Sequence, residues 1–161
     1  MLVPKIRQIR QIRLIALCIC RREDRILVME GRDSVKGQMF YRPLGGGIEF
    51  GELGAEAVAR EFLEEVNAVL NDVRYLFTIE NIFVHEGKPN HELALMYDGL
   101  LADETLYARP LIEGLEANGE PIKAVWKSLH EFDDGHPPLY PSGLRCKLIG
   151  NGPYNEYELK G

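Results

Sequence analysis

The sequence predicts one α/β domain spanning residues 1–161, and three observations support this prediction. The length suits a single domain, and no Pro-, Gly- or Ser-rich linker divides the chain. Apolar residues make up 45% of the sequence and charged residues 27%, which is typical of a globular protein with a buried core. Alternating, strand-like segments lie on both sides of one long segment with helical periodicity.

The strands are predicted from short apolar runs bounded by turn residues. A charged turn at 23–24 joins the first two, and turn residues at 87–90 separate two long alternating segments. Tyr75, Phe77 and Phe83 alternate along one of these segments; we assign them to core packing, with a base-stacking wall as the alternative. The predicted strands and strand-like segments, in chain order, cover residues 12–20, 26–30, 73–85, 92–101 and 122–126, and a loop leads to residues 39–42 before Pro43 breaks any regular element.

The main helix is predicted to run from Leu53 to Val66, because its apolar residues recur at helical spacing. Asn67 suits the left-handed conformation that often follows a helix. Further along the chain, Ser142 is predicted to cap a short helix that ends at Ile149. The segments predicted to be irregular or loosely held are a loop at 31–38, the glycine loop 45–47, the acidic stretch 104–120 and the tail from Gly150.

The net charge and the cysteine content limit the classes of function and the cellular compartment that the sequence suits. The net charge of −6 argues against a general nucleic-acid-binding surface, although metal ions and local arginines can still receive one anionic nucleotide. The three cysteines are predicted to be buried thiols of a cytoplasmic, reducing compartment. The basic N-terminus followed by Leu14–Cys20 fits a strand better than a signal peptide, and no segment reaches the roughly 18 apolar residues of a membrane span.

The helix carries an unusual concentration of acids. Glu61, Glu64 and Glu65 fall within about a third of the helix circumference, and Arg60 precedes them. Like charges at this spacing repel one another by a few tenths of a kcal/mol per pair, so a merely solvated face would include a lysine. Carboxylates grouped in this way favour a hard divalent cation, and such cations commonly act on phosphates.

These residues resemble the Nudix box, Gly-x5-Glu-x7-Arg-Glu-U-x-Glu-Glu-x-Gly-U, in which U is an apolar residue. The matching segment runs from Gly46 through Glu52 and Arg60 to Ala68, and its one departure is Asn67 in place of Gly. Asn tolerates the left-handed conformation better than most residues, so the turn should survive. The resemblance implies the Nudix fold, a mixed β-sheet sandwiched between α-helices, over most of the chain.

The resemblance also implies a chemistry. Nudix hydrolases use divalent ions, usually Mg²⁺, to help water cut the diphosphate linkage of a nucleoside diphosphate joined to another group. Carried over by position, the metal ligands are Glu61, Glu64, Glu65 and the Gly46 carbonyl. Mn²⁺ is an alternative ion. The short signatures of known substrate subclasses are absent, so a nucleoside triphosphate, ADP-ribose or a nucleotide sugar all remain as substrates.

Further roles are assigned around this box. The general base is Glu61 or an acid outside the box; Glu120 is preferred, and Glu113 and Glu116 are alternatives. We place Arg60 and Glu64 in the catalytic group, with Arg60 holding a carboxylate in position. Glu52 is assigned a mainly structural role. The residues expected to approach the substrate are Arg42 and the glycines Gly45, Gly46 and Gly47.

Two other classes remain as alternatives. A Nudix domain can be a non-catalytic nucleotide sensor, but sensors usually lose glutamates that this box retains. Isopentenyl diphosphate isomerase shares the fold and metal affinity, but it needs a catalytic cysteine. Cys18 and Cys20 lie in a strand far before the box, which disfavours that reading. The expected partner is a nucleotide-type small molecule, and a homodimer is compatible with the sequence.

Overall fold

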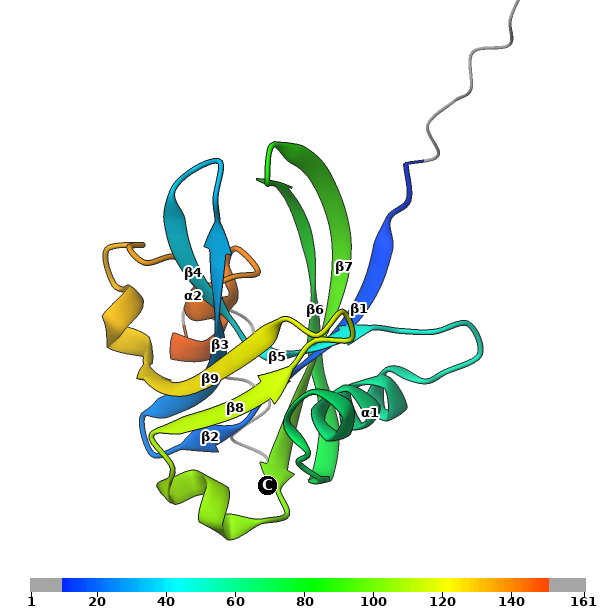
Figure 1. Cartoon of the computed structure of the whole chain (residues 1–161), viewed down its shortest axis with the longest axis vertical. Coiled ribbons are helices and arrows are strands. Elements are labelled where there is room, and N and C mark those ends of the chain that lie inside the picture. Colours follow the sequence, from blue (N-terminus) through cyan, green and yellow to red (C-terminus); the bar gives the residue numbers. More distant parts are fainter. Residues whose placement is uncertain (1–9, 151–161) are drawn as a thin grey trace, which may run out of the picture.

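The computed structural model describes residues 10–150 (Figure 1). Nine strands form two sheets in this part of the chain, and two α-helices and two 3-10 helices, η1 (Glu104–Ala108) and η2 (Leu129–Phe132), accompany them. The predicted loose tail after Gly150 and the first nine positions of the sequence lie outside the described residues. No helix in the described range is long and apolar enough to cross a membrane.

The first sheet is mixed and has the order β5–β1–β7–β6. Its central strand β1 runs parallel to β7 and antiparallel to β5, whereas β6 and β7 form a long antiparallel hairpin. The hairpin turns at Glu86 and Gly87, close to the predicted turn. The strands of this sheet are β1 (Arg13–Ile19), β5 (Leu44–Gly47), β6 (Leu70–His85) and β7 (Lys88–Leu101).

The second sheet has the order β2–β3–β9–β8, and β4 pairs with β3. The predicted loop at 31–38 is shorter than expected, because β3 extends to Asp33 and β4 begins at Gln38 to form a hairpin. The strands of this sheet are β2 (Arg21–Arg22), β3 (Arg25–Asp33), β4 (Gln38–Arg42), β8 (Leu111–Leu115) and β9 (Pro121–Ser128).

The helices flank the two sheets, and α1 and α2 lie on opposite sides of the molecule (Figure 1). Helix α1 (Gly54–Val66) buries Ala57, Val58 and Phe62 against a core that both sheets share. Asn67 has φ 52° and ψ 40°, so the predicted left-handed end of this helix is confirmed. The prediction of mixed sheet flanked by helices is therefore confirmed, with the strands divided between two sheets.

Three local predictions were wrong. The glycines 45–47 are part of β5 and not a loop, because β1 supplies backbone partners along them. The stretch 104–120 holds η1 and β8; the apolar pair Leu111–Ile112 gives β8 a buried residue despite the surrounding acids. Helix α2 (Leu144–Ile149) begins after Gly143, so Ser142 does not cap it.

The cysteines follow the prediction only in part. Cys18 and Cys20 are fully buried thiols in the core beneath α1. Cys146 is exposed, because α2 is a short helix whose one fully buried residue is Leu144.

Candidate active site

Arg60 of α1 organises the carboxylates of the acidic helix. Its Nε and Nη2 donate to the two carboxylate oxygens of Glu52 at 2.8 and 3.0 Å. Its Nη1 donates to Glu61 at 2.8 Å and to Glu64 at 3.2 Å, and Nη2 also donates to the Gly47 carbonyl at 3.0 Å. A guanidinium has five N–H donors in a fixed fork, and this arrangement uses all of them.

The structural role predicted for Glu52 agrees with these contacts. Glu52 lies just before α1, where it receives two bonds from Arg60 and one from the Glu49 amide at 3.0 Å. These bonds favour the charged carboxylate, so they lower the pKa of Glu52 to about 2, with the Arg60 hydrogen bond as the main cause. Glu52 therefore anchors the arginine that holds Glu61 and Glu64.

Gly46 lets the helix carboxylate lie directly against β5. A Cβ at this position would meet the Glu61 carboxyl carbon at 2.6 Å and its two oxygens at 2.7 and 2.8 Å. Gly45 must also be a glycine, for a different reason. Its φ is +134°, and a Cβ there would meet the Ala16 carbonyl oxygen of β1 at 2.1 Å. The glycines thus allow close approach of backbone and carboxylate within a paired strand.

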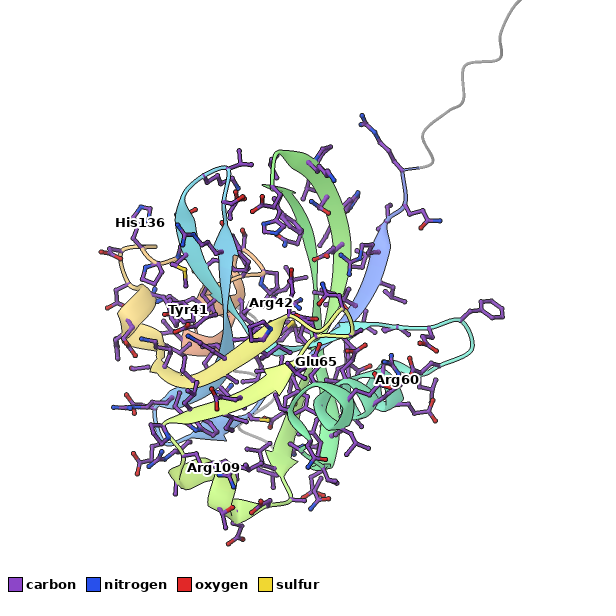
Figure 2. All side chains as sticks on the ribbon, in the orientation of Figure 1. Tyr41, Arg42, Arg60, Glu65, Arg109 and His136 are labelled. Atoms are coloured by element: carbon purple, nitrogen blue, oxygen red, sulfur yellow. The ribbon has the colours of Figure 1, made fainter. Side chains whose placement is uncertain are left out.

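Glu65 is the most deeply buried of the three helix acids, with 7% of its surface exposed. Its Oε2 is buried and has no hydrogen-bond partner within residues 10–150. Burial, followed by the negative charges of Glu116 and Glu61, raises the pKa of Glu65 to about 8, while Arg42 acts in the opposite direction. Figure 2 shows Arg42 and Glu65 near the centre of the molecule, at the inner side of α1.

The residues around Glu61 and Glu65 fit a divalent cation in part. An unpartnered buried carboxylate oxygen next to a second carboxylate is the kind of hard donor that Mg²⁺ accepts. Glu64 lies on the exposed side, with 59% of its side chain accessible, and contacts Arg60. Across the described residues, no three His, Cys, Asp or Glu side chains are grouped closely enough to hold one ion as they stand.

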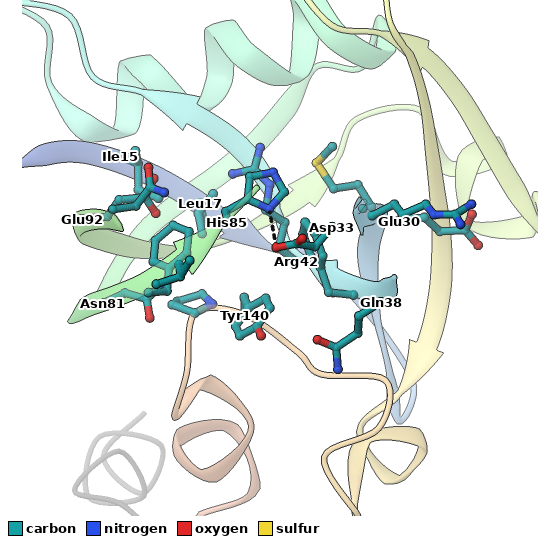
Figure 3. Close-up of a pocket in the computed structure, with 18 of the residues that line it drawn as sticks. Ile15, Leu17, Glu30, Asp33, Gln38, Arg42, Asn81, His85, Glu92 and Tyr140 are labelled. Carbon is teal, nitrogen blue, oxygen red and sulfur yellow. Dashed lines mark ion pairs between the residues drawn. The ribbon is translucent and has the colours of Figure 1, made fainter. Parts of the chain in front are cut away.

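A cavity of about 490 Å³ lies between the two sheets. Residues of β1, β6 and β7 line one side, and residues of β3 and β4 line the other (Figure 3). At its mouth the β3–β4 and β6–β7 hairpins meet: the His85 imidazole lies 3.4 Å from the Asp33 carboxylate, and Ser34 donates to Glu86.

Arg42, Glu116 and Glu120 belong to the part of the cavity considered for the site, and the first two also act on the acidic helix. All three line the cavity, whereas the box glutamates and the glycines 45–47 do not. The charges of Arg42 and Glu116 nevertheless act on buried Glu65, so these groups connect the two parts of the site. Glu116 and Glu120 flank the β8–β9 turn, where the Glu116 amide donates to the Glu120 carbonyl at 2.8 Å.

The alternative base Glu113 does not reach the cavity. It pairs with Lys123 along β8 and β9, and its side chain is exposed. Among the acids considered outside the box, the structure therefore brings Glu116 and Glu120 to the cavity and leaves Glu113 away from it.

Sequence reasoning missed two polar residues on the cavity wall, Asn81 and Glu92. Both are at least nine-tenths buried, with 5% and 7% of their surfaces exposed. A signal was present: Glu92 is in phase with the inward-facing residues Ala94 and Met96, and Asn81 is in phase with Ile79. A polar residue in phase with the buried face of a strand indicates a built polar site.

Comparison with known proteins places the chain in a family. A family model described as the NUDIX domain matches residues 10–144. The chain therefore belongs to the Nudix family, and the Nudix hydrolase recognised in the sequence is confirmed at that level. The match includes the whole box as well as both sheets, so the box and the fold agree.

Solved structures show the same fold at low identity. The MutT NUDIX hydrolase of Burkholderia pseudomallei is 22% identical, with a TM-score of 0.53 over 75% of this chain and 86% of that one. A NUDIX hydrolase of Nitrosomonas europaea is 15% identical, with a TM-score of 0.59 over 92% and 90%. The mutator MutT protein of Bacillus halodurans is 18% identical, with a TM-score of 0.53 over 83% and 78%.

Proposed function

We propose that this protein hydrolyses the diphosphate linkage of a nucleoside diphosphate joined to another group, with Mg²⁺ or Mn²⁺ as its cofactor. The observation that carries the proposal is the buried carboxylate of Glu65, whose Oε2 lacks a partner within residues 10–150. It lies beside Glu61 and is linked electrostatically to a cavity that contains Arg42. A nucleotide in that cavity would bring its phosphates to the acidic helix.

The ion would be held by Glu61, Glu65, Glu64 and the Gly46 carbonyl. When bound, it would neutralise charge on the diphosphate and lower the pKa of the attacking water. Arg60 positions Glu61 and Glu64 through its hydrogen bonds and is itself fixed by Glu52. Arg42, at the junction of cavity and helix, would bind a phosphate oxygen, because a guanidinium matches that geometry.

The proton of the attacking water would pass to a carboxylate within hydrogen-bond reach. Glu61, Glu116 and Glu120 are the candidates that the geometry supports. Gly46 allows close backbone approach beside Glu61, Gly45 allows β5 to lie against β1, and the Gly47 carbonyl accepts from Arg60. A nucleoside triphosphate, ADP-ribose and a nucleotide sugar remain the substrate classes. The cytoplasmic location and the homodimer stay predictions.

The metal requirement can be tested directly. We expect product release from a panel of nucleoside diphosphate derivatives, read by product mass, to need Mg²⁺ or Mn²⁺ and to stop in excess chelator. Hydrolysis that continues undiminished in chelator would remove the metal from the mechanism.

The ligand assignment can be tested by two substitutions. Glu64→Gln and Glu65→Gln should each lower kcat by at least about 10-fold, because each removes charge from an ion ligand. For Glu65→Gln, stability without metal should stay the same or rise, since burial and the neighbouring acids disfavour its charged form. Glu64→Gln also loses the charge that pairs with Arg60, and since Glu64 is exposed its stability should change little. Glu104→Gln in η1 is the matched control and should keep normal kinetics. Full activity or unfolding of both variants would contradict the assignment.

A further inference from the structure

The wall of the cavity carries a row of buried polar side chains beside an apolar row. Asn81 of β6 pairs with Glu92 of β7, and Glu92 pairs in turn with Arg13 of β1. The next row along the same face is apolar and consists of Ile79, Ala94 and Ile15. Figure 3 shows Asn81 and Glu92 on the side of the pocket opposite Glu30 and Gln38.

The hydrogen-bonding capacity of Asn81 and Glu92 is only partly used by other residues of the protein. The Asn81 amide side chain has no hydrogen-bond partner within residues 10–150, although only 5% of the residue is exposed. Glu92 makes one ion pair, with Arg13 at 3.2 Å, and its side chain is 10% exposed. A carboxylate has about four lone-pair sites, so Glu92 retains the capacity to accept further bonds. Both side chains line the cavity, so this unused hydrogen-bonding capacity is open to a ligand there.

We propose that this cavity receives the base of the nucleotide and that Glu92 and Asn81 select a guanine-type base. The inference rests on the proposed function, because it assumes that the phosphates lie at the acidic helix. A carboxylate only accepts hydrogen bonds, so Glu92 requires donors on the base. Guanine presents two adjacent donors, its ring N1–H and its 2-amino group, next to the O6 acceptor. The Asn81 amide can donate to O6 while Glu92 accepts from the other two.

Other bases fit this pair less well. Adenine would direct the lone pair of its N1 at the Glu92 carboxylate and offer one amino donor beside it. Uracil has an acceptor, O2, in place of the guanine 2-amino donor, and cytosine has acceptors, N3 and O2, in place of both guanine donors. A site built to hydrogen-bond a particular edge discriminates strongly, since the wrong edge leaves buried polar groups unpaired.

The rest of the cavity suits a nucleoside in size and chemistry. Its volume is about 490 Å³, and the aromatic rings of Phe40, Phe83 and Tyr140 are among its lining residues. Aromatic faces stack on any base, so they supply affinity while the polar row supplies selection. The base-stacking alternative considered for Phe83 is thereby part of the proposal.

The wild-type protein provides the first test. We expect kcat/KM to decrease in the order GTP, ITP, ATP, with GTP favoured over ATP by about 10- to 100-fold, the size of one bidentate base contact. ITP should fall between them because hypoxanthine lacks the 2-amino donor. Calorimetric titration with GMP, IMP and AMP in chelator should give the same order of affinity without any hydrolysis.

Two variants assign the selection to the residues. Glu92→Gln should reduce the preference for GMP over AMP by at least about 10-fold, because an amide can pair with either edge. Asn81→Ala should weaken GMP binding and leave AMP binding nearly unchanged. Glu80→Gln is the matched control: it lies next to Asn81 in β6 on the outer face, with 63% of its side chain exposed, and should keep the wild-type preference. Thermal unfolding checks that each variant is folded.

The outcomes separate this inference from the proposed function. Equal kcat/KM values for GTP and ATP, or tighter binding of AMP than GMP, would overturn guanine selection while metal-dependent hydrolysis stands. GMP selection without hydrolysis of any diphosphate compound would keep the inference and reject the proposed enzyme. A preference for GMP that survives unchanged in Glu92→Gln would remove Glu92 from the selection.

Discussion

At the scale of single residues, Arg60 determines how the helix acids are arranged. Its guanidinium bonds Glu52 on one side and Glu61 and Glu64 on the other. We predict that Arg60→Lys lowers the free energy of unfolding by about 1–3 kcal/mol, since an ammonium cannot reproduce the bidentate bond to Glu52. kcat should fall as well, because Glu61 and Glu64 lose their positioning contact. Urea denaturation and steady-state kinetics measure the two effects.

Arg74→Lys provides the control for this experiment. Arg74 makes one ion pair, with Asp98 at 3.2 Å, and 75% of its side chain is exposed. Exposed pairs contribute little, so stability should change by less than about 1 kcal/mol. Equal losses in the two variants would show that the Arg60 network has no special role.

The ion pair of Glu52 with Arg60 makes the stability of the protein depend on pH. The Arg60 bond lowers its pKa in the folded protein to about 2, below the value of an unfolded glutamate. Its stabilising effect is therefore fully present above about pH 4.5 and is lost as the pH falls toward 2. We predict that Glu52→Gln is less stable than wild type at pH 6 and that this difference shrinks at pH 3. Urea midpoints at both pH values measure it, and a constant difference would contradict the linkage.

At the scale of elements, the turn between β8 and β9 connects the cavity to the acidic helix. It places Glu116 and Glu120 at the cavity, and the charge of Glu116 acts on Glu65. We predict that Glu116→Gln or Glu120→Gln lowers kcat more than it changes substrate affinity, because the role needs a base near the attacking water. Kinetics of both variants, with folding checked by circular dichroism, decide between the two acids.

The controls for the turn lie on either side of it in the sequence. Glu113→Gln and Glu104→Gln should keep wild-type kinetics, since Glu113 is exposed along β8 and Glu104 belongs to η1. Wild-type kinetics for both turn variants would leave Glu61 as the base. A strong loss in Glu113→Gln would contradict the position that the strand pairing gives it.

Strand β5 shows which elements sequence patterns can predict. Helix α1 and the β6–β7 hairpin were predictable, because long amphipathic or alternating segments carry their own periodicity. The glycines of β5 have no side chains, so no periodicity marks them as a strand. Their pairing with β1 and the contact of Gly46 with Glu61 are set by residues distant in the sequence. The box indicated that Gly46 lies near the acidic helix, but the strand conformation of the three glycines could not be predicted from it.

At the scale of the whole molecule, the candidate site combines two kinds of information. The acids of α1 come from one short segment, so spacing alone was enough to group them. The cavity comes from strands β1, β3, β4, β6 and β7, and its polar wall depends on which strands become neighbours. Asn81 and Glu92 meet only through the register of the β6–β7 hairpin, and Arg13 joins them only through the β1–β7 pairing.

The two sheets share their core, and this has a consequence for unfolding. Ile19 of β1 and Val28 of β3 are fully buried in one apolar cluster, although their strands belong to different sheets. We predict a single cooperative transition, in which fluorescence of the one tryptophan, Trp126 of β9, coincides with circular dichroism of the backbone.

A substitution in the first sheet, read by the tryptophan of the second sheet, tests whether the two sheets unfold together. Ile19→Val should cost about 0.5–1.5 kcal/mol and shift the Trp126 transition and the circular dichroism transition equally, because the mutated residue and the probe unfold together. Leu100→Val is the control, since Leu100 is 51% exposed on β7, and it should change stability by less than about 0.5 kcal/mol. If Ile19→Val moved the backbone transition and left Trp126 unchanged, the two sheets would be separate folding units, and the single domain predicted from the sequence would have to be divided between them.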